Sequence, residues 1–212
     1  MGLGFEKLVF GGLTKVFAGI VIAPIGGVIF GLLLTGLIIT IFANRKPAIV
    51  NKTFGRLQII SSAWFALTHG ANDGQKTMGI IVLILFSAGL IPELEMPLWV
   101  IFAAATAMGL GTFFGGYKVI KTLGVKITKL KPYQGFAAET GGGIMLAIFA
   151  TLGIPASTTH AITGTIMGAG AARRKRAVRW NVSRQIVFSW IITIPGSAAM
   201  GIGFTFLINL FV

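Results

Sequence analysis

The sequence predicts an all-α integral membrane protein, and three observations lead to this prediction. Hydrophobic residues make up 55% of the 212-residue chain and charged residues only 11%, whereas soluble domains carry about 25% charged residues. Apolar runs long enough to cross a bilayer as helices recur along the chain. Alternating ten-residue strand patterns do not recur, so helices must satisfy the backbone. We therefore expect a helical bundle in a lipid bilayer, with residues 1–212 forming a single transmembrane domain.

The net charge of +13 comes mainly from three groups of Lys and Arg in predicted loops. These are Arg45, Lys46, Lys52 and Arg56; Lys118, Lys121, Lys126, Lys129 and Lys131; and Arg173, Arg174, Lys175, Arg176, Arg179 and Arg184. The positive-inside rule places these loops in the cytoplasm and the loop with Glu93 and Glu95 on the opposite side of a plasma membrane that the chain crosses several times. Cations that are spread over three loops, without interleaved aromatic residues, exclude a nucleic-acid partner. The absence of cysteine excludes disulfides and thiolate metal sites.

The first predicted crossing runs from Val16 to Ala43. We expect residues 1–15 to form an amphipathic lead-in rather than a signal peptide, because no small-residue cleavage site clearly follows them. Pro24 predicts a kink in the crossing helix. The spacing of Gly27 and Gly31 predicts a face that packs closely against another helix.

The next segment, residues 56–90, carries a polar stretch at residues 68–79 with the sequence THGANDGQKTMG. Ionisable groups at membrane depth cost about 2.5 to 3.5 kcal/mol each on insertion scales, and they are functional candidates by default. The glycines in this stretch favour a discontinuous helix, and the segment is longer than the roughly 30 Å that one crossing needs. The side chains suit two kinds of ligand: Asn72 and Asp73 can bind a cation, while Gln75, Lys76 and Thr77 can donate to an anion.

Three other interpretations of residues 68–79 stay open. The stretch nearly matches a nucleotide phosphate-binding loop, but Gln75 stands where the second glycine of that loop must be and no soluble strand precedes it. His69 and Asp73 would share a metal on a continuous helix, although the only other histidine, His160, is remote in sequence. A purely structural polar patch between helices is the third interpretation.

After the acidic loop, residues 98–116 are expected to return toward the cytoplasm as a helix. Gly111 and Gly115 predict a packing face on this helix. The second basic loop, residues 117–134, follows.

Residues 136–170 must enter and leave the membrane on the same side, because a basic loop lies at each end. We expect an interruption at residues 153–155, where Pro155 blocks helix continuation and Ser157 caps the following helix. Free amides and hydroxyls at this turn form an anion site by geometry, or simply a capped helix. Glu139 is either an interfacial or a functional carboxylate. A final crossing is expected over residues 186–212.

At residues 68–79 and 153–164 the chain resembles the inorganic phosphate transporter (PiT) family, in which a G-[AT]-N-D core is followed by a P-x-S-T-T-H turn. The second stretch reads IPASTTHAITG over residues 154–164. Short flanking segments at residues 137–139 and 193–195 also resemble the family, so the resemblance covers nearly the whole chain. It is closest to the C-terminal repeat of the family.

The resemblance implies a secondary transporter, not an enzyme, that carries inorganic phosphate across the membrane in symport with sodium or protons and needs no other cofactor. Asn72 and Asp73 look like cation ligands, for sodium if the coupling ion is sodium. The residues that look like phosphate or cation contacts are Gln75, Thr77, Ser157, Thr158 and Thr159. Lys76 either attracts phosphate or pairs with Asp73, and Glu139 and His160 match positions associated with transport.

The family has inverted repeats that each carry both motifs, whereas this sequence has one copy of each. We therefore expect one half of an inverted-repeat transporter that needs a second half or an oligomer. A channel of the same fold and a non-transporting anion-binding membrane subunit remain alternatives, as does sulfate as the substrate.

Overall fold

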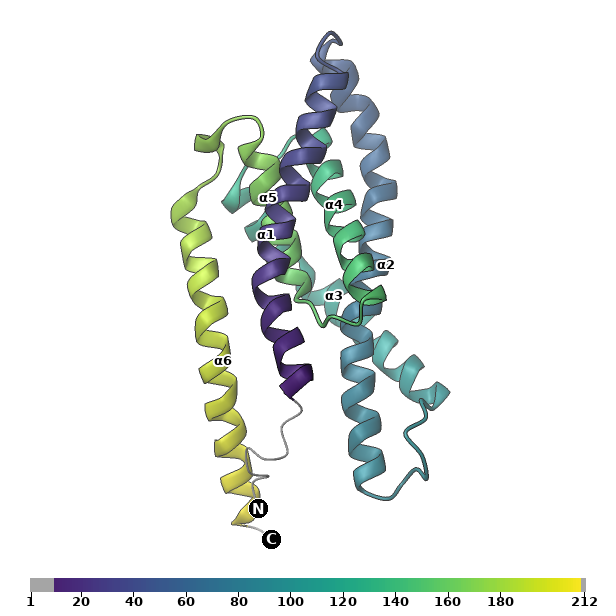
Figure 1. Ribbon diagram of the computed structural model, residues 1–212. Coiled ribbons are helices and arrows are strands. Elements are labelled where there is room, and N and C mark those ends of the chain that lie inside the picture. Colours follow the sequence, from purple (N-terminus) through teal and green to yellow (C-terminus); the bar gives the residue numbers. More distant parts are fainter. Residues whose placement is uncertain (1–9, 211–212) are drawn as a thin grey trace.

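The described part of the chain, residues 10–210, is mostly helical and has no strand (Figure 1). This structure is a computed structural model, and it describes those residues apart from the side chains at 118 and 120. Its α-helices are α1 (Phe10–Ile41), α2 (Pro47–Ser87), α3 (Leu98–Lys121), α4 (Pro132–Thr151), α5 (Thr158–Ala171) and α6 (Trp180–Asn209), with a short π-helix η2 (Thr122–Ile127) and a 3₁₀ helix η3 (Lys175–Ala177). The prediction of an all-α chain is confirmed. The first nine residues of the predicted lead-in lie outside the described residues, and the rest belong to α1.

The core lies where α1, α4, α5 and the first half of α2 meet. The closest pair is α1 against α5, which approach nearly backbone to backbone. A Cβ added at Gly27 would lie 2.6 Å from the Ala161 carbonyl oxygen, and one added at Gly31 would clash with the Thr165 carbonyl oxygen. The predicted packing face of Gly27 and Gly31 is therefore confirmed.

The predicted packing face on α3 is wrong. Gly111 and Gly115 are exposed, and no described residue lies within 4 Å of a Cβ added at either position. Within the described part of the chain, α3 packs against α2 and η2. The predicted loop over residues 117–134 is also largely helical, because α3 continues to Lys121 and η2 to Ile127.

The predicted break at residues 68–79 is wrong as well, because α2 is one continuous helix of 41 residues. Its polar side chains bond within the helix: Asn72 Nδ2 donates to the Thr68 carbonyl at 2.9 Å, and Thr77 Oγ1 to the Asp73 carbonyl at 3.3 Å. Each glycine in a helix costs about 1 kcal/mol relative to alanine, which such local bonds and tertiary contacts offset. At 1.5 Å per residue the helix is about 60 Å long.

The predicted interruption between α4 and α5 is confirmed. Gly153 adopts a φ of +60°, which favours glycine, and its amide donates to the Ala150 carbonyl at 3.2 Å. The Ile154 amide donates to the Phe149 carbonyl at 2.9 Å, which completes a Schellman ending of α4. Pro155 follows, and α5 turns back beside α4, so the hairpin tip lies against the N-terminal third of α1, where the Pro155 carbonyl faces Gly19 (Figure 1).

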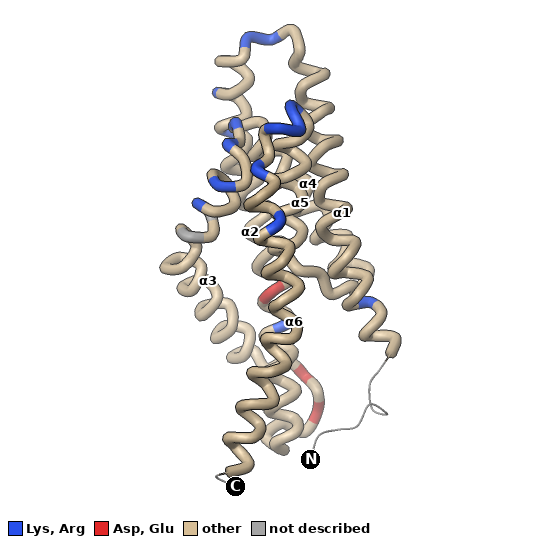
Figure 2. Tube along the Cα trace, turned by 90° about the vertical axis from the view of Figure 1, so that its left-hand side faces the viewer, with Lys and Arg blue, Asp and Glu red and all other residues tan. Residues whose placement is uncertain are grey.

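Lys and Arg gather toward one end of the molecule, around the α1–α2, α3–α4 and α5–α6 connections, while the acidic α2–α3 loop lies toward the other end (Figure 2). Among the described residues, three helical segments are long and apolar enough to cross a membrane: Phe10–Ile41, Leu98–Ile127 and Trp180–Asn209. The most exposed of them is α6, in which Ser183 is the one buried residue of the described helix. Large apolar side chains thus cover the outer surface, as they do in a protein surrounded by lipid.

Candidate functional site

The polar middle of α2 lies against the tip of the α4–α5 hairpin, and Asp73 is the centre of this contact. One carboxylate oxygen, Oδ2, accepts from Thr158 Oγ1 at 2.9 Å and lies 3.0 Å from His69 Nε2. The other, Oδ1, lies 3.0 Å from the Lys76 ammonium. The structure therefore brings together residues from both sequence motifs.

Lys76 joins the two elements a second time. Its ammonium group donates to the Ala156 carbonyl at 2.6 Å while it pairs with Asp73. Of the two roles left open by the sequence, the structure shows the pairing with Asp73. A carboxylate and a backbone carbonyl are also the oxygen ligands that a hard cation prefers, so the ammonium sits where such a cation would find its ligands.

Asn72 holds α2 against α4 rather than facing Asp73. Its side chain is buried, and Nδ2 lies 3.5 Å from the Leu146 carbonyl on α4 in addition to its bond to Thr68. A cation could bind only the amide oxygen of Asn72, because the amide nitrogen is a hydrogen-bond donor.

The three hydroxyl residues at the hairpin tip have different surroundings. Ser157 caps α5 by accepting from the His160 amide at 3.3 Å, as expected from the sequence. Thr158 is buried and donates to Asp73, whereas Thr159 is exposed. A free anion would therefore meet Thr159 and the first amides of α5 before the other two hydroxyls.

Gln75 and Thr77 do not join this contact. Both are exposed on α2, Gln75 makes no hydrogen bond among the described residues, and Thr77 bonds only to its own helix. The helical continuity of α2 explains the position of Gln75, which lies about 200° around the helix from Asp73. Thr77 is one turn after Asp73, and its hydroxyl donates to the Asp73 carbonyl instead.

Glu139 lies in a second polar contact, further along α2. Ser61 Oγ donates to its Oε2 at 2.6 Å, and Gln58 Nε2 donates to its Oε1 at 3.3 Å. Ser61 and Asp73 are 12 residues apart on α2, or about 18 Å. Gln58 and Ser61 are not among the predicted site residues. Their spacing of three on one helix is a signal of a shared face, but their partner Glu139 is about 80 residues away in the sequence.

The His160 side chain faces away from Asp73, toward α6. Its ring lies over Trp190 with ring centroids 3.9 Å apart, in an apolar cleft of about 430 Å³ between α1, α5 and α6. Its Nδ1 is buried without a hydrogen-bond partner among the described residues. The side chain thus belongs to the α6 contact, and its backbone amide belongs to the cap of the hairpin tip.

The continuous helix places His69 and Asp73 on one face, as a shared metal site would require. However, no group of three or more His, Cys, Asp or Glu side chains that could hold a metal occurs among the described residues.

A family model and several relatives match most of the chain. A family model described as "Phosphate transporter family" matches residues 1–201. The chain is 48% identical over 196 residues to a "Probable low-affinity inorganic phosphate transporter" of Rhizobium meliloti (strain 1021), covering 92% of this chain and 59% of the relative. It is 39% identical to a relative of the same name from Bacillus subtilis (strain 168), covering 98% of this chain and 62% of the relative. The chain thus spans about three fifths of the length of these two relatives.

The fold is similar to that of a solved structure described as "The sodium-dependent phosphate transporter". The two superpose with a TM-score of 0.76 at 24% sequence identity, over 91% of this chain and 66% of that structure. This likeness supports the overall arrangement of helices described above.

Proposed function

Because the chain belongs to the phosphate transporter family, we propose that it forms part of a secondary transporter that carries inorganic phosphate across the plasma membrane in symport with sodium or protons. Its relatives are named as transporters and permeases, and the chain is a membrane protein rather than an enzyme. The observation that carries the proposal is the contact of Asp73 and Lys76 on α2 with Thr158 and Ala156 at the hairpin tip. This contact joins an acidic cation site to an anion-binding turn.

Coupling follows from the shared position of Lys76. In the described state its ammonium neutralises Asp73 and occupies the Ala156 carbonyl. A sodium ion or a proton at Asp73 weakens the attraction between the Lys76 ammonium and the Asp73 carboxylate, because two cations compete for one carboxylate. The released ammonium is then free to bind phosphate beside Thr159 and the first amides of α5. Cation binding therefore raises the affinity for phosphate, as symport requires.

The missing elements of the site belong to a second half. Gln75, Thr77 and Thr159 are exposed in this chain, and the relatives are longer than it. A second repeat that packs against α2 and the hairpin tip would enclose phosphate near the membrane midplane, where alternating access takes place.

The test is uptake of radiolabelled phosphate by proteoliposomes that contain the chain together with its second half. We expect accumulation against a phosphate gradient when a sodium or proton gradient is imposed. Asp73→Asn should abolish this coupling, while Glu95→Gln, which removes an exposed acid in the α2–α3 loop, should not. Phosphate movement only down its own gradient would indicate a channel, and binding without movement a non-transporting subunit; sulfate in place of phosphate tests the alternative substrate.

A further inference from the structure

A pocket of about 210 Å³ opens at the basic end of the molecule, far from the Asp73 contact. It lies between the α1–α2 connection, the first turn of α4 and the segment that follows α5. Asn51, which lines it, and Asp73 are 22 residues apart on α2, or about 33 Å along the helix. None of its eleven lining residues is acidic.

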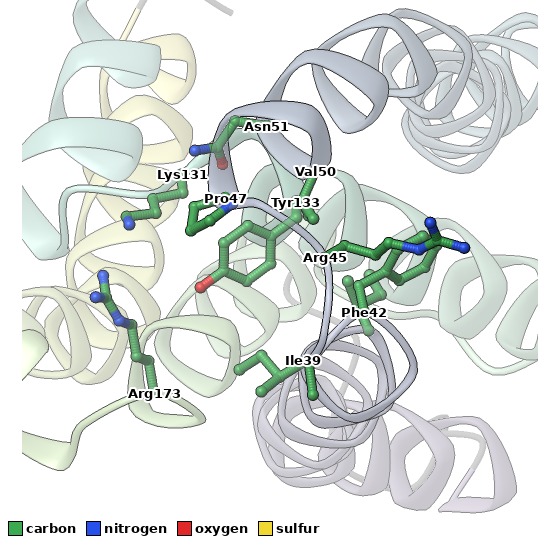
Figure 3. A pocket seen from close by; sticks show the side chains of 11 residues that line it. Ile39, Phe42, Arg45, Pro47, Val50, Asn51, Lys131, Tyr133 and Arg173 are labelled. Carbon is green, nitrogen blue, oxygen red and sulfur yellow. The ribbon is translucent and has the colours of Figure 1, made fainter.

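Two cations face one another across this pocket (Figure 3). The side chains of Lys131 and Arg173 point toward each other beside the hydroxyl of Tyr133, whereas Arg45 points away on the other side of the Tyr133 ring. Like charges repel, so two cations placed together with no lining acid favour an anion between them. Arginine and lysine with a phenol hydroxyl form a donor set that suits a phosphate group.

A buried polar atom at the same place lacks a partner. Asn51 Oδ1 is buried and has no hydrogen bond among the described residues. Four buried side-chain atoms lack a partner among the described residues, and Asn51 Oδ1 is the one of them that lines this pocket, so a bound group could supply its partner. This oxygen would accept from a hydroxyl of the bound molecule, and a 180° rotation of the amide would present donors instead.

The position of α4 adds to the positive potential. Lys131 is the residue that precedes its first turn and Tyr133 lies within that turn, so the positive end of the 20-residue helix is directed at the pocket. The Tyr133 ring itself packs on the apolar cluster around Ile38 and Phe54, which fixes the position of its hydroxyl. The pocket is therefore held by rigid helices rather than by loops alone.

We propose that this basic pocket is a second anion site, in which Lys131, Arg173, the Tyr133 hydroxyl and the Asn51 amide bind a phosphate group. The group belongs either to free inorganic phosphate or to the headgroup of an anionic lipid. Both carry the same charge chemistry, and the basic end of a membrane protein meets both.

The test is calorimetric titration of the purified full chain in a neutral detergent at fixed salt. The titrants are sodium phosphate, dioctanoyl phosphatidylglycerol, and dioctanoyl phosphatidylcholine as the lipid without net charge. We expect Lys131→Gln/Arg173→Gln to weaken binding of at least one of the first two by tenfold or more. The matched control is Lys129→Gln/Arg176→Gln, which removes two exposed cations from the same two connections without touching the pocket, and it should change binding less than threefold.

If Lys131→Gln/Arg173→Gln weakens the binding of phosphate, the ligand is the free ion. If it weakens the binding of phosphatidylglycerol, the ligand is a lipid headgroup. Binding at the Asp73 contact is common to both double variants and cancels in the comparison. Tyr133→Phe keeps the packed ring and should weaken the same titrant by about threefold to tenfold, which tests the pocket without changing charge. Equal losses in both double variants, or binding of neither anion above phosphatidylcholine, would overturn the proposal.

Discussion

At the scale of single residues, the described state is defined by a lysine that stands where a cation would bind. The side chains of Lys76 and Asp73 are 42% and 32% exposed, so solvent screens their ion pair and it contributes only about 0.5 to 1 kcal/mol. A pair of this strength is easily displaced, which a transport cycle needs. A fully buried pair would hold the site closed.

Replacing Lys76 with methionine should therefore change the affinities for the coupling cation and for phosphate in opposite directions. We expect Lys76→Met to raise the apparent affinity for sodium or protons about twofold to fivefold, because Asp73 loses its internal competitor. Phosphate affinity should fall at the same time, because its counter-charge is gone. The measurement is the cation and phosphate dependence of uptake, with Lys15→Met as a control for loss of a remote charge. A fall in both the cation affinity and the phosphate affinity would contradict the proposal that the coupling cation replaces Lys76 at Asp73.

The neighbouring threonines should differ in the same assay. Thr158→Val removes a donor to Asp73 and should change the dependence on the coupling cation. Thr159→Val should instead weaken phosphate binding, by about 1.5 to 3 kcal/mol for one hydrogen bond to a charged group. Valine keeps the shape of threonine in both variants. Identical effects of the two substitutions would indicate that the turn is only a helix cap and binds neither ligand.

At the scale of helices, glycines decide how closely α1 and α5 approach. Gly31→Ala places a methyl group against the Thr165 carbonyl, and such overpacking costs about 1 to 3 kcal/mol. Gly36→Ala on the same helix meets no described atom within 4 Å and should stabilise the helix by up to about 1 kcal/mol. Thermal unfolding in detergent should move in opposite directions for the two variants. A similar shift for both would mean that α1 does not pack on α5 through Gly31.

The same comparison shows what the sequence can predict about elements. Gly27 and Gly31 predict close packing and have it, whereas Gly111 and Gly115 have the same spacing and face open space. Spacing identifies a face that permits close approach, but the partner helix has to be present. The hairpin is predictable because Gly153 and Pro155 act locally, through a left-handed φ and a missing amide.

The continuity of α2 was not predictable in this way. Glycines and polar residues between 68 and 79 predict a break when each is weighed alone. The bonds of Asn72 and Thr77 to carbonyls one turn earlier satisfy these side chains on an intact helix. For the candidate site, the structure brings together Asp73 and the hairpin tip, which come from the two motifs. The contact of Ala156 could not be predicted, because a backbone carbonyl has no sequence signature.

At the scale of the whole molecule, the charge distribution bears on how a second half is supplied. The basic connections gather at one end, and the loop with Glu93 and Glu95 has no Lys or Arg. One membrane orientation should therefore dominate. Two copies inserted the same way cannot form an inverted repeat, so we expect the second half to come from a different sequence.

Single cysteines test this orientation without a background to remove, because the chain has none. Glu93→Cys should react with an impermeant thiol reagent in intact cells, and Lys175→Cys only after the membrane is opened. The chain expressed alone should show no phosphate uptake. Equal labelling of both positions in intact cells, together with uptake, would indicate an antiparallel homodimer.

The nearly side-chain-free contact of α1 with α5 also decides which parts of the molecule are able to move. Two backbones in direct contact leave no room to slide, so α1 and the hairpin tip should behave as a fixed frame. The part of α2 from Asp73 onward is held to the tip by polar contacts that ligands replace. Spin labels at 22 and 152 should keep their distance when phosphate and the coupling cation are added, and labels at 75 and 152 should not. A changed distance between 22 and 152 would rule out the frame. If that distance is unchanged, the glycines of α1 serve, in mechanical terms, as the anchor against which the second half of α2 works as the moving arm.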